Sequence, residues 1–522
     1  MLLETFLPVL LPLIAGTLVL LARAGGIGVQ RLVSLLALVA LLIVNLNAMQ
    51  IAVQLPPQVY ALGNWVAPFG IVMVLDKLSA TMVLLTSILA LAALWYAISQ
   101  KIDEKGAHFH VLFQIQLFGL NGAFMTGDVF NLFVFFEVLL LASYGLLLHG
   151  GGRLKTRAGL HYVSINLVGS TLFLFAVGAL YGILGTLNLA DMAVKVAALP
   201  VEDQGIVAAA GLMLLLVFGV KAAMFPLYLW LPQAYANTTA PVAALFAIMT
   251  KVGLYAIIRV HGTLFGDSAG ALSDLHIPWV LWLGLITLLF AGLGAIASRK
   301  LREQVAYLVL ASVATLLIGI GINNPASMSA TLFYLIHSTL IAGAFFLLAD
   351  WIRQGRGEVE DEFTRSYAMP KAIIVGSVFM FAAVAMSGLP PLSGFMGKLM
   401  ILSSALNHPA FFWILAIVLL AGLFMIIAVA RAGSLLFYNV LPKEVCHTVD
   451  NKEVCTTPEN LKLKGALSVF GLLSAAVLLV VFANTFHSFT DSVAQQLSHS
   501  ETYQYQVLHV EPLSNSRKEL VE

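Results

Sequence analysis

Five ionisable side chains stand inside stretches that are otherwise apolar. Glu137 interrupts VFNLFVFFEVLLLASY, and the others are Lys221, Lys251, His337 and Lys398. A charge facing lipid at mid-depth would cost roughly 2.5–3.5 kcal/mol on insertion scales, so such residues point into a helix bundle and meet partners or water. Glutamate, lysine and histidine in such places are typical of ion and proton paths. We therefore predict that these five residues, the relay candidates, carry protons.

The composition places the relay candidates in a membrane protein. Of the 522 residues, 60% are hydrophobic and 10% are charged, and the mean hydropathy is +0.95. Soluble domains carry about 25% charged residues. The net charge of +1 gives no electrostatic reason to bind nucleic acid. We expect an all-α polytopic membrane protein.

About fourteen transmembrane helices are expected, because one crossing needs about 20 apolar residues. Their expected ranges are 4–22, 31–53, 71–99, 109–126, 129–148, 158–185, 206–231, 240–262, 277–298, 303–322, 326–350, 370–404, 410–438 and 464–486. The polar tail from about Thr490 is expected to lie on the surface.

Two of these helices carry breaks beside a lysine. Pro226 cannot donate the hydrogen bond that a helix needs, so it should free backbone carbonyls next to Lys221. Pro390 and Pro391 interrupt the long twelfth helix just before Lys398. Broken helices at corresponding positions indicate an inverted-repeat transporter. The breaks are five helices apart, which predicts two inverted five-helix repeats with broken helices 7 and 12.

This repeat pattern predicts four parts of the chain. They are residues 1–106 with helices 1–3, residues 107–262 with the first repeat, residues 277–438 with the second repeat, and residues 464–522 with the last helix and the polar tail.

The distribution of basic residues predicts the orientation. The odd-numbered loops hold 18 of the 27 Lys and Arg residues, and basic loops stay on the cytoplasmic side. Both termini should therefore face outside. The same rule places Cys446 and Cys455 in a reducing compartment as free thiols.

No cofactor or metal is expected. Cys446 and Cys455, with His447 beside them, are a poor zinc or redox motif at this spacing. The chain shows no Gly-rich nucleotide loop and no haem ligand pair. The chemistry must then come from the ionisable side chains themselves.

A structural interpretation of the relay candidates also stands. Glu137 and the three lysines could form ion pairs that only hold helices together, and His337 could be a core histidine bonded to a carbonyl. A membrane scaffold of this kind predicts that Glu137→Gln and Lys221→Ala spoil assembly rather than transport.

Four other charged or titratable residues are expected near the outer surface. Arg259 and His261 should lie at the rim, where long side chains reach the interface. Asp76 and Asp128 should begin helices, where acidic residues are favourable.

Three motifs resemble the antiporter-like subunits shared by Mrp-type multisubunit cation/proton antiporters, respiratory complex I and membrane-bound hydrogenases. They are GDVFNLFVFFEVLLLASY, VKAAMFPLYLWLPQAYANTTAPVAALFAIMTKVGLY and SGLPPLSGFMGKLMIL. The resemblance extends over nearly the whole chain. It implies that Glu137 pairs with Lys221, and that Lys251 and Lys398 continue the path.

The resemblance also gives His337 the role of the histidine on the eleventh helix. Some relatives have two histidines four residues apart there, whereas Phe333 occupies the earlier place in this chain. That part of the relay departs from the family pattern.

The fifth and twelfth helices are most similar to the D-type subunits of Mrp antiporters. One complex I branch has glutamate where this chain has Lys398, and the longer subunits continue well beyond the last helix. The resemblance implies a non-enzymatic, proton-translocating subunit of a Na⁺ or K⁺/proton antiporter in a bacterial cytoplasmic membrane. A large A-type subunit and small membrane subunits would be its partners. The alternative is a proton-pumping subunit of a complex I or hydrogenase-type redox complex.

Overall fold

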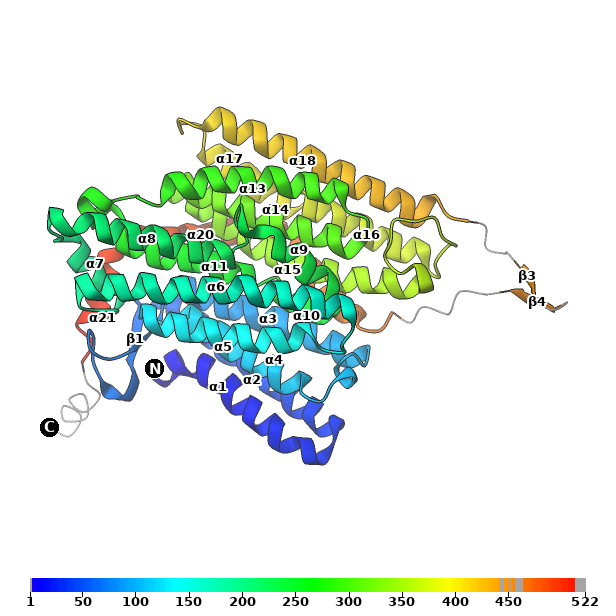
Figure 1. The fold of residues 1–522 in the computed structure, drawn as a ribbon, viewed down its shortest axis with the longest axis horizontal. Helices are drawn as coiled ribbons and strands as arrows, with labels where there is room; N and C mark the ends of the chain where they lie inside the picture. Colours follow the sequence, from blue (N-terminus) through cyan, green and yellow to red (C-terminus); the bar gives the residue numbers. More distant parts are fainter. Residues whose placement is uncertain (1, 442–445, 450–451, 456–462, 512–522) are drawn as a thin grey trace.

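The computed structural model describes residues 2–441, 446–449, 452–455 and 463–511. Most of the described chain is helical, and its four short strands form two hairpins. The helices run side by side in one elongated bundle, with α1 and α2 along one flank and α17 and α18 along the opposite flank (Figure 1).

The first half of the chain, as described, contains twelve helices and one hairpin. They are α1 (Leu2–Leu21), α2 (Ile27–Gln54), β1 (Gln58–Ala61), β2 (Val72–Leu75), α3 (Lys77–Ser99), α4 (Phe109–Met125), α5 (Val129–Leu147), α6 (Arg153–Leu184), α7 (Leu189–Ala197), α8 (Val201–Lys221), α9 (Trp230–Asn237), α10 (Ala240–Phe246), α11 (Met249–Ala256) and α12 (Gly262–Leu264). A π-helical turn, Ile257–His261, joins α11 to α12.

The described residues of the second half form nine helices and a second hairpin. They are α13 (Ile277–Ala297), α14 (Leu301–Gly321), α15 (Pro325–Gly355), α16 (Ala372–Ser387), α17 (Ser393–Ser404), α18 (Phe411–Gly433), β3 (Cys446–Val449), β4 (Lys452–Cys455), α19 (Ala466–Val481), α20 (Ala483–Ser498) and α21 (Ser500–Leu508).

The chain is an all-α polytopic membrane protein. Eleven helices in the described part are long and apolar enough to cross a membrane, or twelve if α19 and α20 form one span bent by 87°. The shorter apolar helices α4 and α16, of 17 and 16 residues, occupy the positions of the expected fourth and twelfth crossings. Every expected range thus contains a helix.

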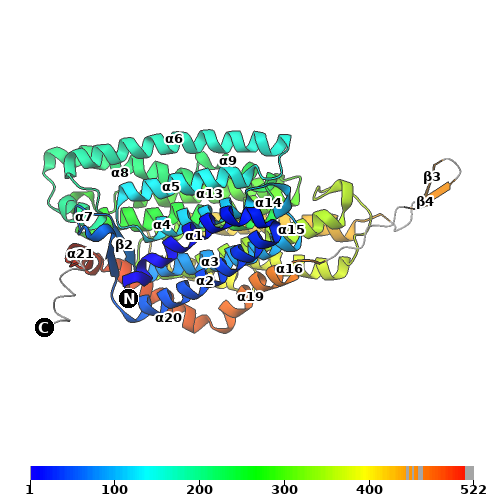
Figure 2. The same ribbon diagram turned by 90° about the horizontal axis from the view of Figure 1, so that it is seen from below.

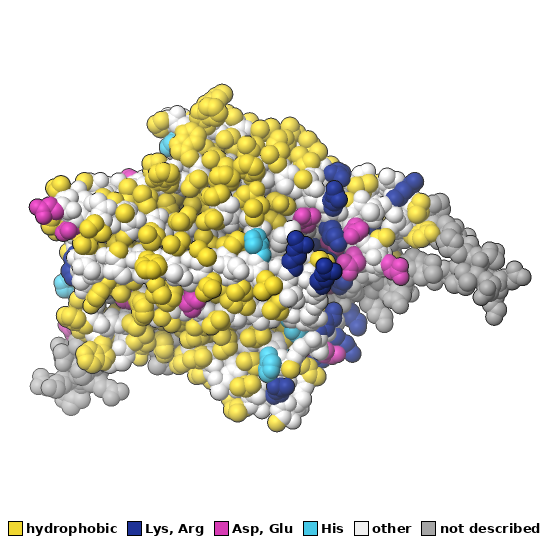
Figure 3. All heavy atoms as spheres, in the orientation of Figure 1, with side chains coloured by type: hydrophobic (Ala, Val, Ile, Leu, Met, Phe, Trp, Pro, Cys, Tyr) yellow, Lys and Arg dark blue, Asp and Glu magenta, His cyan; other side chains and the backbone are white. Residues whose placement is uncertain are grey.

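A broad apolar surface covers the visible face of the bundle. Figure 3 shows hydrophobic side chains along the visible length of the helices, whereas Lys and Arg side chains gather near the end of the bundle from which the β3–β4 hairpin projects. The opposite end carries α7, α21 and the β1–β2 hairpin (Figures 1 and 2). These are called the basic end and the α21 end below.

The structure corrects one prediction about the ends of the helices. The third helix begins at Lys77, not at residue 71, because Val72–Leu75 pairs with Gln58–Ala61 as a hairpin. The tail from Thr490 lies at the surface, where its helices are packed onto the bundle. Thr490 is fully buried, and α20 and α21 pack against α3, α15 and α7. An apolar stripe on α20 and α21 explains this packing, since Val493 and Val507 lie in the core.

Both predicted helix breaks are present. Helix α8 ends at Lys221 and α9 starts at Trp230, with a short 3₁₀ turn before it. Helix α16 ends at Ser387 and α17 starts at Ser393. The boundaries of the two inverted repeats around these breaks stay a prediction.

Candidate functional site: buried lysines at two broken helices

The first break leaves backbone groups that nearby side chains satisfy. The indole Nε1 of Trp230 donates to the carbonyl of Val220 at 3.0 Å, and the amide of Phe225 donates to Thr287 Oγ1 at 2.9 Å. The break is present at Pro226 as predicted, and two backbone groups beside it are bonded to α9 and α13. The break is a fixed structure with Lys221 as the last residue of α8.

Lys221 is buried at this break, with an exposed fraction of 7%. Its Nζ donates to Asn166 Oδ1 on α6 at 3.1 Å and lies 5.8 Å from the centre of the Phe136 ring. A small cavity beside it is also lined by Met249 and Val252 and has room for about one water molecule. The C-terminal end of α8 also favours the positive charge, because the helix dipole is negative there.

Glu137 is half-buried on α5 and does not contact Lys221. Ser170 on α6 donates a hydrogen bond to its carboxylate, and none of the ion pairs within 4.0 Å in the described part of the chain joins it to Lys221. Asn166 and Ser170 are four residues apart on α6, so one face of this helix stands against both charges. The predicted pair is open, with a neutral partner on each side.

Lys251 lies on α11 and is fully buried. No described residue accepts a hydrogen bond from its Nζ. Gly253, two residues on, packs directly on the first break: a Cβ there would lie 2.5 Å from the amide nitrogen of Ala222. This close approach packs α11, the helix of Lys251, against the end of α8. A buried ammonium without a partner is costly, which favours a neutral amine or a change of partner during function.

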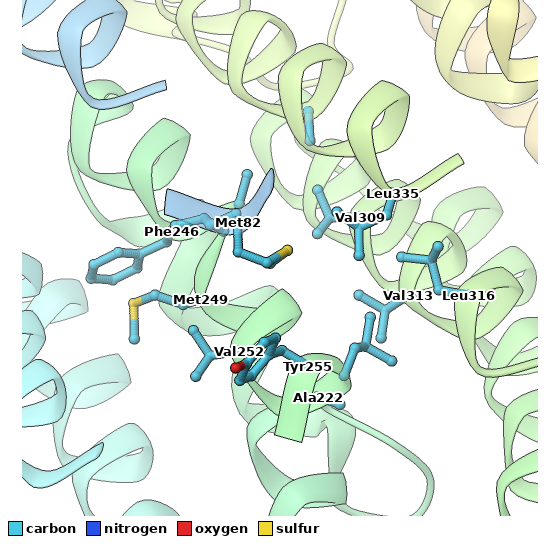
Figure 4. Packing of buried hydrophobic residues seen from close by; sticks show 14 of the residues in the cluster. Met82, Ala222, Phe246, Met249, Val252, Tyr255, Val309, Val313, Leu316 and Leu335 are labelled. Carbon is cyan, nitrogen blue, oxygen red and sulfur yellow. The ribbon is translucent and has the colours of Figure 1, made fainter. Parts of the chain in front are cut away.

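Apolar side chains fill the space between the two halves of the bundle. Helix α11 contacts α14, whose buried side chains Val309, Val313 and Leu316 lie on the side of α11 away from Val252 (Figure 4). In the described part of the chain, no hydrogen bond connects Lys251 to the second break. The structure thus separates the relay candidates into two polar groups.

The second break brings Lys398 and the end of α16 together. Lys398 lies on α17 with an exposed fraction of 9%, and its Nζ donates to the carbonyl of Ser387 at 2.7 Å. Gly388 follows that carbonyl with φ = +78°, and its missing side chain leaves room, because a Cβ would lie 3.0 Å from Nζ. Lys398 therefore satisfies the carbonyl that the break leaves free, at the negative end of α16.

His337 of α15 joins both halves of the second break. Its Nδ1 is 2.7 Å from the hydroxyl of Ser393 at the start of α17, and its Nε2 is 3.1 Å from the carbonyl of Ala385 in α16. Gly394 allows this contact, since a Cβ there would lie 2.8 Å from Nε2. The structure thus brings His337 and Lys398 to one break, and Glu137, Lys221 and Lys251 to the region of the other.

Several partners of the relay candidates were not predicted. Asn166 and Ser170 are the partners at the first site, and Ser387 and Ser393 are those at the second. A signal for the first pair exists in SINLVGSTLFLF, where two polar residues stand four apart in an apolar helix. No comparable signal marks Ser387, which contributes only its carbonyl.

The prediction that Arg259 and His261 lie at an exposed rim is wrong. Arg259 is 5% exposed and its guanidinium lies 2.6 Å from Asp76 Oδ2, while His261 is buried and bonds to the carbonyl of Gly211. The folded-back helices α20 and α21 cover this end of the bundle, which the apolar pattern of the spans could not reveal.

The prediction for the two aspartates is confirmed. Asp76 caps α3 by accepting from the amide of Ser79, and Asp128 caps α5 by accepting from the amide of Asn131. The side chains of Cys446 and Cys455 lie outside the described residues. Within the described part, no group of three or more His, Cys, Asp or Glu side chains could hold a metal ion.

Comparison with known proteins shows the family to which this chain belongs. Residues 126–424 match the family model described as NADH:quinone oxidoreductase/Mrp antiporter, transmembrane. A D-type subunit of a probable K⁺/H⁺ antiporter from Rhizobium meliloti (strain 1021) is 42% identical over 465 residues, covering 83% of this chain and 86% of the relative. The chain belongs to the family of Mrp antiporter D-type subunits.

Further relatives cover the chain almost end to end. A D-type subunit of a Na⁺/H⁺ antiporter from Bacillus subtilis (strain 168) is 34% identical over 502 residues, covering 95% of this chain and 97% of the relative. A chain in the structure of the Mrp complex from Dietzia sp. DQ12-45-1b has a TM-score of 0.83 at 26% identity, with 97% of this chain and 100% of that chain covered. Membership of the Mrp family therefore rests on both sequence and fold.

Proposed function

We propose that this chain is the proton-translocating subunit of a multisubunit Na⁺ or K⁺/proton antiporter, a transporter component and not an enzyme. The observation that carries the proposal is the placement of Lys221 and Lys398 at two helix breaks, with Lys251 buried beside the first. Burying three lysines inside one apolar bundle costs free energy, and such lysines usually mark an ion or proton path. The ammonium groups of Lys221 and Lys398 each donate a hydrogen bond to one acceptor, and movement of the lysine would break this bond.

Lys221 is the switch of the first site. Burial disfavours an ammonium, and a carboxylate close by favours it. In the described arrangement Lys221 Nζ faces Asn166, and Glu137 accepts from Ser170. Movement of Lys221 towards Glu137 would load it with a proton, and its return to the neutral amide would favour release. The released proton would pass inward to Lys251 through the cavity lined by Met249 and Val252.

The second site receives the proton through His337 and Lys398. His337 reaches both α16 and α17, so a change in its protonation would alter its bonds to both sides of the break. Passage from Lys251 to His337 must cross the apolar contact of α11 with α14. Hydration or opening of this contact would then couple the two sites, as a gate that is closed in this structure.

The basic end is inferred to face the cytoplasm of a bacterium, and the α21 end the outside. Lysine and arginine side chains gather at the former (Figure 3), and basic loops remain on the cytoplasmic side. Proton entry from the α21 end would then drive the export of Na⁺ or K⁺. The names of the relatives mention K⁺ in one case and Na⁺ in another, so either cation fits.

Other membrane subunits complete the antiporter, a large A-type subunit and several small ones. The solved relative is part of an Mrp complex. The redox-driven alternative uses the same fold, and the relatives at 34–42% identity, both named as antiporter subunits, favour the antiporter.

The test is cation-dependent proton flux in everted vesicles from an antiporter-deficient strain that expresses the full operon. Wild type is compared with Lys221→Ala, and the amount of assembled complex is measured for both. We expect flux to be lost in an intact complex, and comparison of Na⁺ with K⁺ names the cation. Lys195→Ala is the matched control, because Lys195 is 41% exposed on α7 in an ion pair with Asp191. Retained flux in Lys221→Ala would make the buried charges structural.

A further inference from the structure

A hydrogen-bonded group of polar side chains lies between Lys251 and the α21 end, and it begins on the same helix as Lys251. Tyr255 lies four residues after Lys251 on α11, about 6 Å along the helix axis. Arg259 lies four residues further, in the π-helical turn, and its Nε donates to the Tyr255 hydroxyl at 3.2 Å. Its Nη2 donates to Asp76 Oδ2 at 2.6 Å. Tyr255, Arg259 and Asp76 are thus joined by hydrogen bonds in a group that the buried-charge pattern did not predict.

The members of this group are fixed by further bonds. The Tyr255 hydroxyl donates to the carbonyl of Phe124 on α4 at 2.6 Å. Asp76 Oδ1 accepts from the amide of Ser79 as the cap of α3. Three elements, α3, α4 and α11, therefore meet at this group. Arg259 keeps its proton at any physiological pH, so it cannot itself pass a proton on.

The C-terminal helices cover the outer end of the group. The ring of Tyr503 on α21 lies 5.2 Å from the guanidinium of Arg259, and its buried hydroxyl has no hydrogen-bond partner among the described residues. Gln496 on α20 accepts from the backbone amide of Lys77, next to Asp76. As a result, Asp76 is 2% exposed although it stands at the end of its helix.

This burial needs an explanation, because a buried ion pair is no efficient way to stabilise a fold. Desolvation of both charges can exceed their attraction, and apolar residues of similar size often serve as well. The pair is joined through one hydroxyl to the helix of Lys251, and the α20–α21 cover packs over its outer end. Its position fits proton passage better than packing alone.

We propose that Tyr255, Arg259 and Asp76 form the outer arm of the relay, with α20–α21 as its cover. The proposal rests on the proposed function, since it supplies protons to Lys251. When the cover lifts, the Asp76 carboxylate takes a proton from outer water and loses its ion pair with Arg259. The proton then passes inward to the neutral amine of Lys251, and Asp76 returns to the carboxylate. Tyr255 is a positioning residue that holds Arg259 over this route.

The decisive variants are Asp76→Asn and the double variant Asp76→Asn/Arg259→Gln. Asparagine caps a helix as well as aspartate does, so the start of α3 is kept while the charge is removed. The double variant removes both charges, so no unpaired charge is left buried. We expect both complexes to assemble with flux reduced by at least about tenfold, below the roughly 10²–10⁴-fold that a general acid–base group contributes in an enzyme. Wild-type flux in the assembled double variant would overturn the proposal.

Tyr255→Phe decides the question if the double variant does not assemble. It keeps the ring and removes only the hydroxyl that holds Arg259. We expect a loss of about fivefold in an assembled complex, because a bond that positions a charged group contributes less than the group that transfers the proton. Tyr235→Phe is the matched control, since the hydroxyl of Tyr235 makes the same kind of bond, to the carbonyl of Phe246 at 2.6 Å. Equal flux in the two variants would show that Tyr255 has no role in transport, and it would refute the proposed arm.

Lys221→Ala in the same vesicle series separates this inference from the proposed function. Loss of flux in Lys221→Ala with normal flux in the arm variants refutes the arm only. Normal flux in Lys221→Ala refutes the relay itself, and the arm with it.

Discussion

The two broken helices hold their lysines in opposite ways. Lys221 is the last residue before its break and reaches sideways to Asn166 on α6. Lys398 follows its break and reaches back to the carbonyl of Ser387. In the first break, Trp230 satisfies a carbonyl near the end of α8, whereas in the second the lysine itself does so. The first lysine is therefore free to change partners, and the second is part of the break.

The surroundings of the two lysines also indicate that Lys221 can change partners and that Lys398 cannot. The first site offers a second partner, Glu137, which an uncharged serine occupies in this structure. The second site has no carboxylate bonded to its lysine within the described residues, and His337 bonds to a hydroxyl and a carbonyl. A lysine with two alternative partners can take up and release its proton as it changes between them, so it can act as a switch. A lysine with one partner can hold a proton, so it can act as a store. We infer that the Lys221 site at the first break controls when a proton is released, and that the Lys398 site at the second break receives this proton.

The largest effect is expected from Glu137→Gln, which removes the alternative partner and leaves the shape of the site. Lys221 then has only neutral partners, and we expect flux to fall by about a hundredfold, within the range of lost acid–base groups. Cation-dependent proton flux with measured assembly is the check. Glu202→Gln, an exposed residue in the first turn of α8, should leave flux unchanged. A structural ion pair would instead show a loss of complex.

Lys398→Arg tests whether the second lysine gives up its proton. Arginine keeps the charge and can still donate to the Ser387 carbonyl, but it does not deprotonate in proteins. We expect normal assembly and about a tenfold loss of flux, since the store is fixed in its charged form. If flux stays at the wild-type level, Lys398 serves only to bond the end of α16, and the second site carries no proton.

Gly394→Ala should damage the second break more than a similar change elsewhere. A Cβ at Gly394 would lie 2.8 Å from His337 Nε2, whereas a Cβ at Gly422 on α18 has no atom within 4 Å. Forcing extra volume into a packed site costs about 1–3 kcal/mol. Thermal denaturation of the purified complex should show a lower Tm for Gly394→Ala than for Gly422→Ala. Equal Tm values would mean that the second break takes up the extra methyl group without a loss of stability.

The sequence predicted the parts of this comparison that depend on local chemistry. Pro226, Pro390 and Pro391 mark the breaks because proline cannot continue a helix. Lys221, Lys251, Lys398 and His337 are buried as their apolar surroundings predict. These features follow from single residues and their neighbours, which a sequence states directly.

The parts that depend on distant contacts could not be predicted. Whether Glu137 faces Lys221 or Ser170 depends on how α5 and α6 are rotated, which hydrophobic periodicity leaves open. Arg259 meets Asp76, 183 residues away, under helices whose polar sequence predicts a surface tail. The short apolar run 72–75 fits a helix and a strand equally well, and only its pairing with residues 58–61 decides between them.

The smallest effects should come from the two neutral partners on α6. Asn166→Ala removes the bond that holds Lys221 away from Glu137, and Ser170→Ala removes the one that occupies the carboxylate. The net contribution of a single intramolecular hydrogen bond is about 0.5–1.5 kcal/mol, a few-fold change in an equilibrium constant. Both variants should favour the closed Glu137–Lys221 pair, so we expect each to slow proton release and lower flux a few-fold in the vesicle assay. If Asn166→Ala alone matters, the amide is a direct partner in transfer, and the switch depends on Asn166 more than on the serine bound to Glu137.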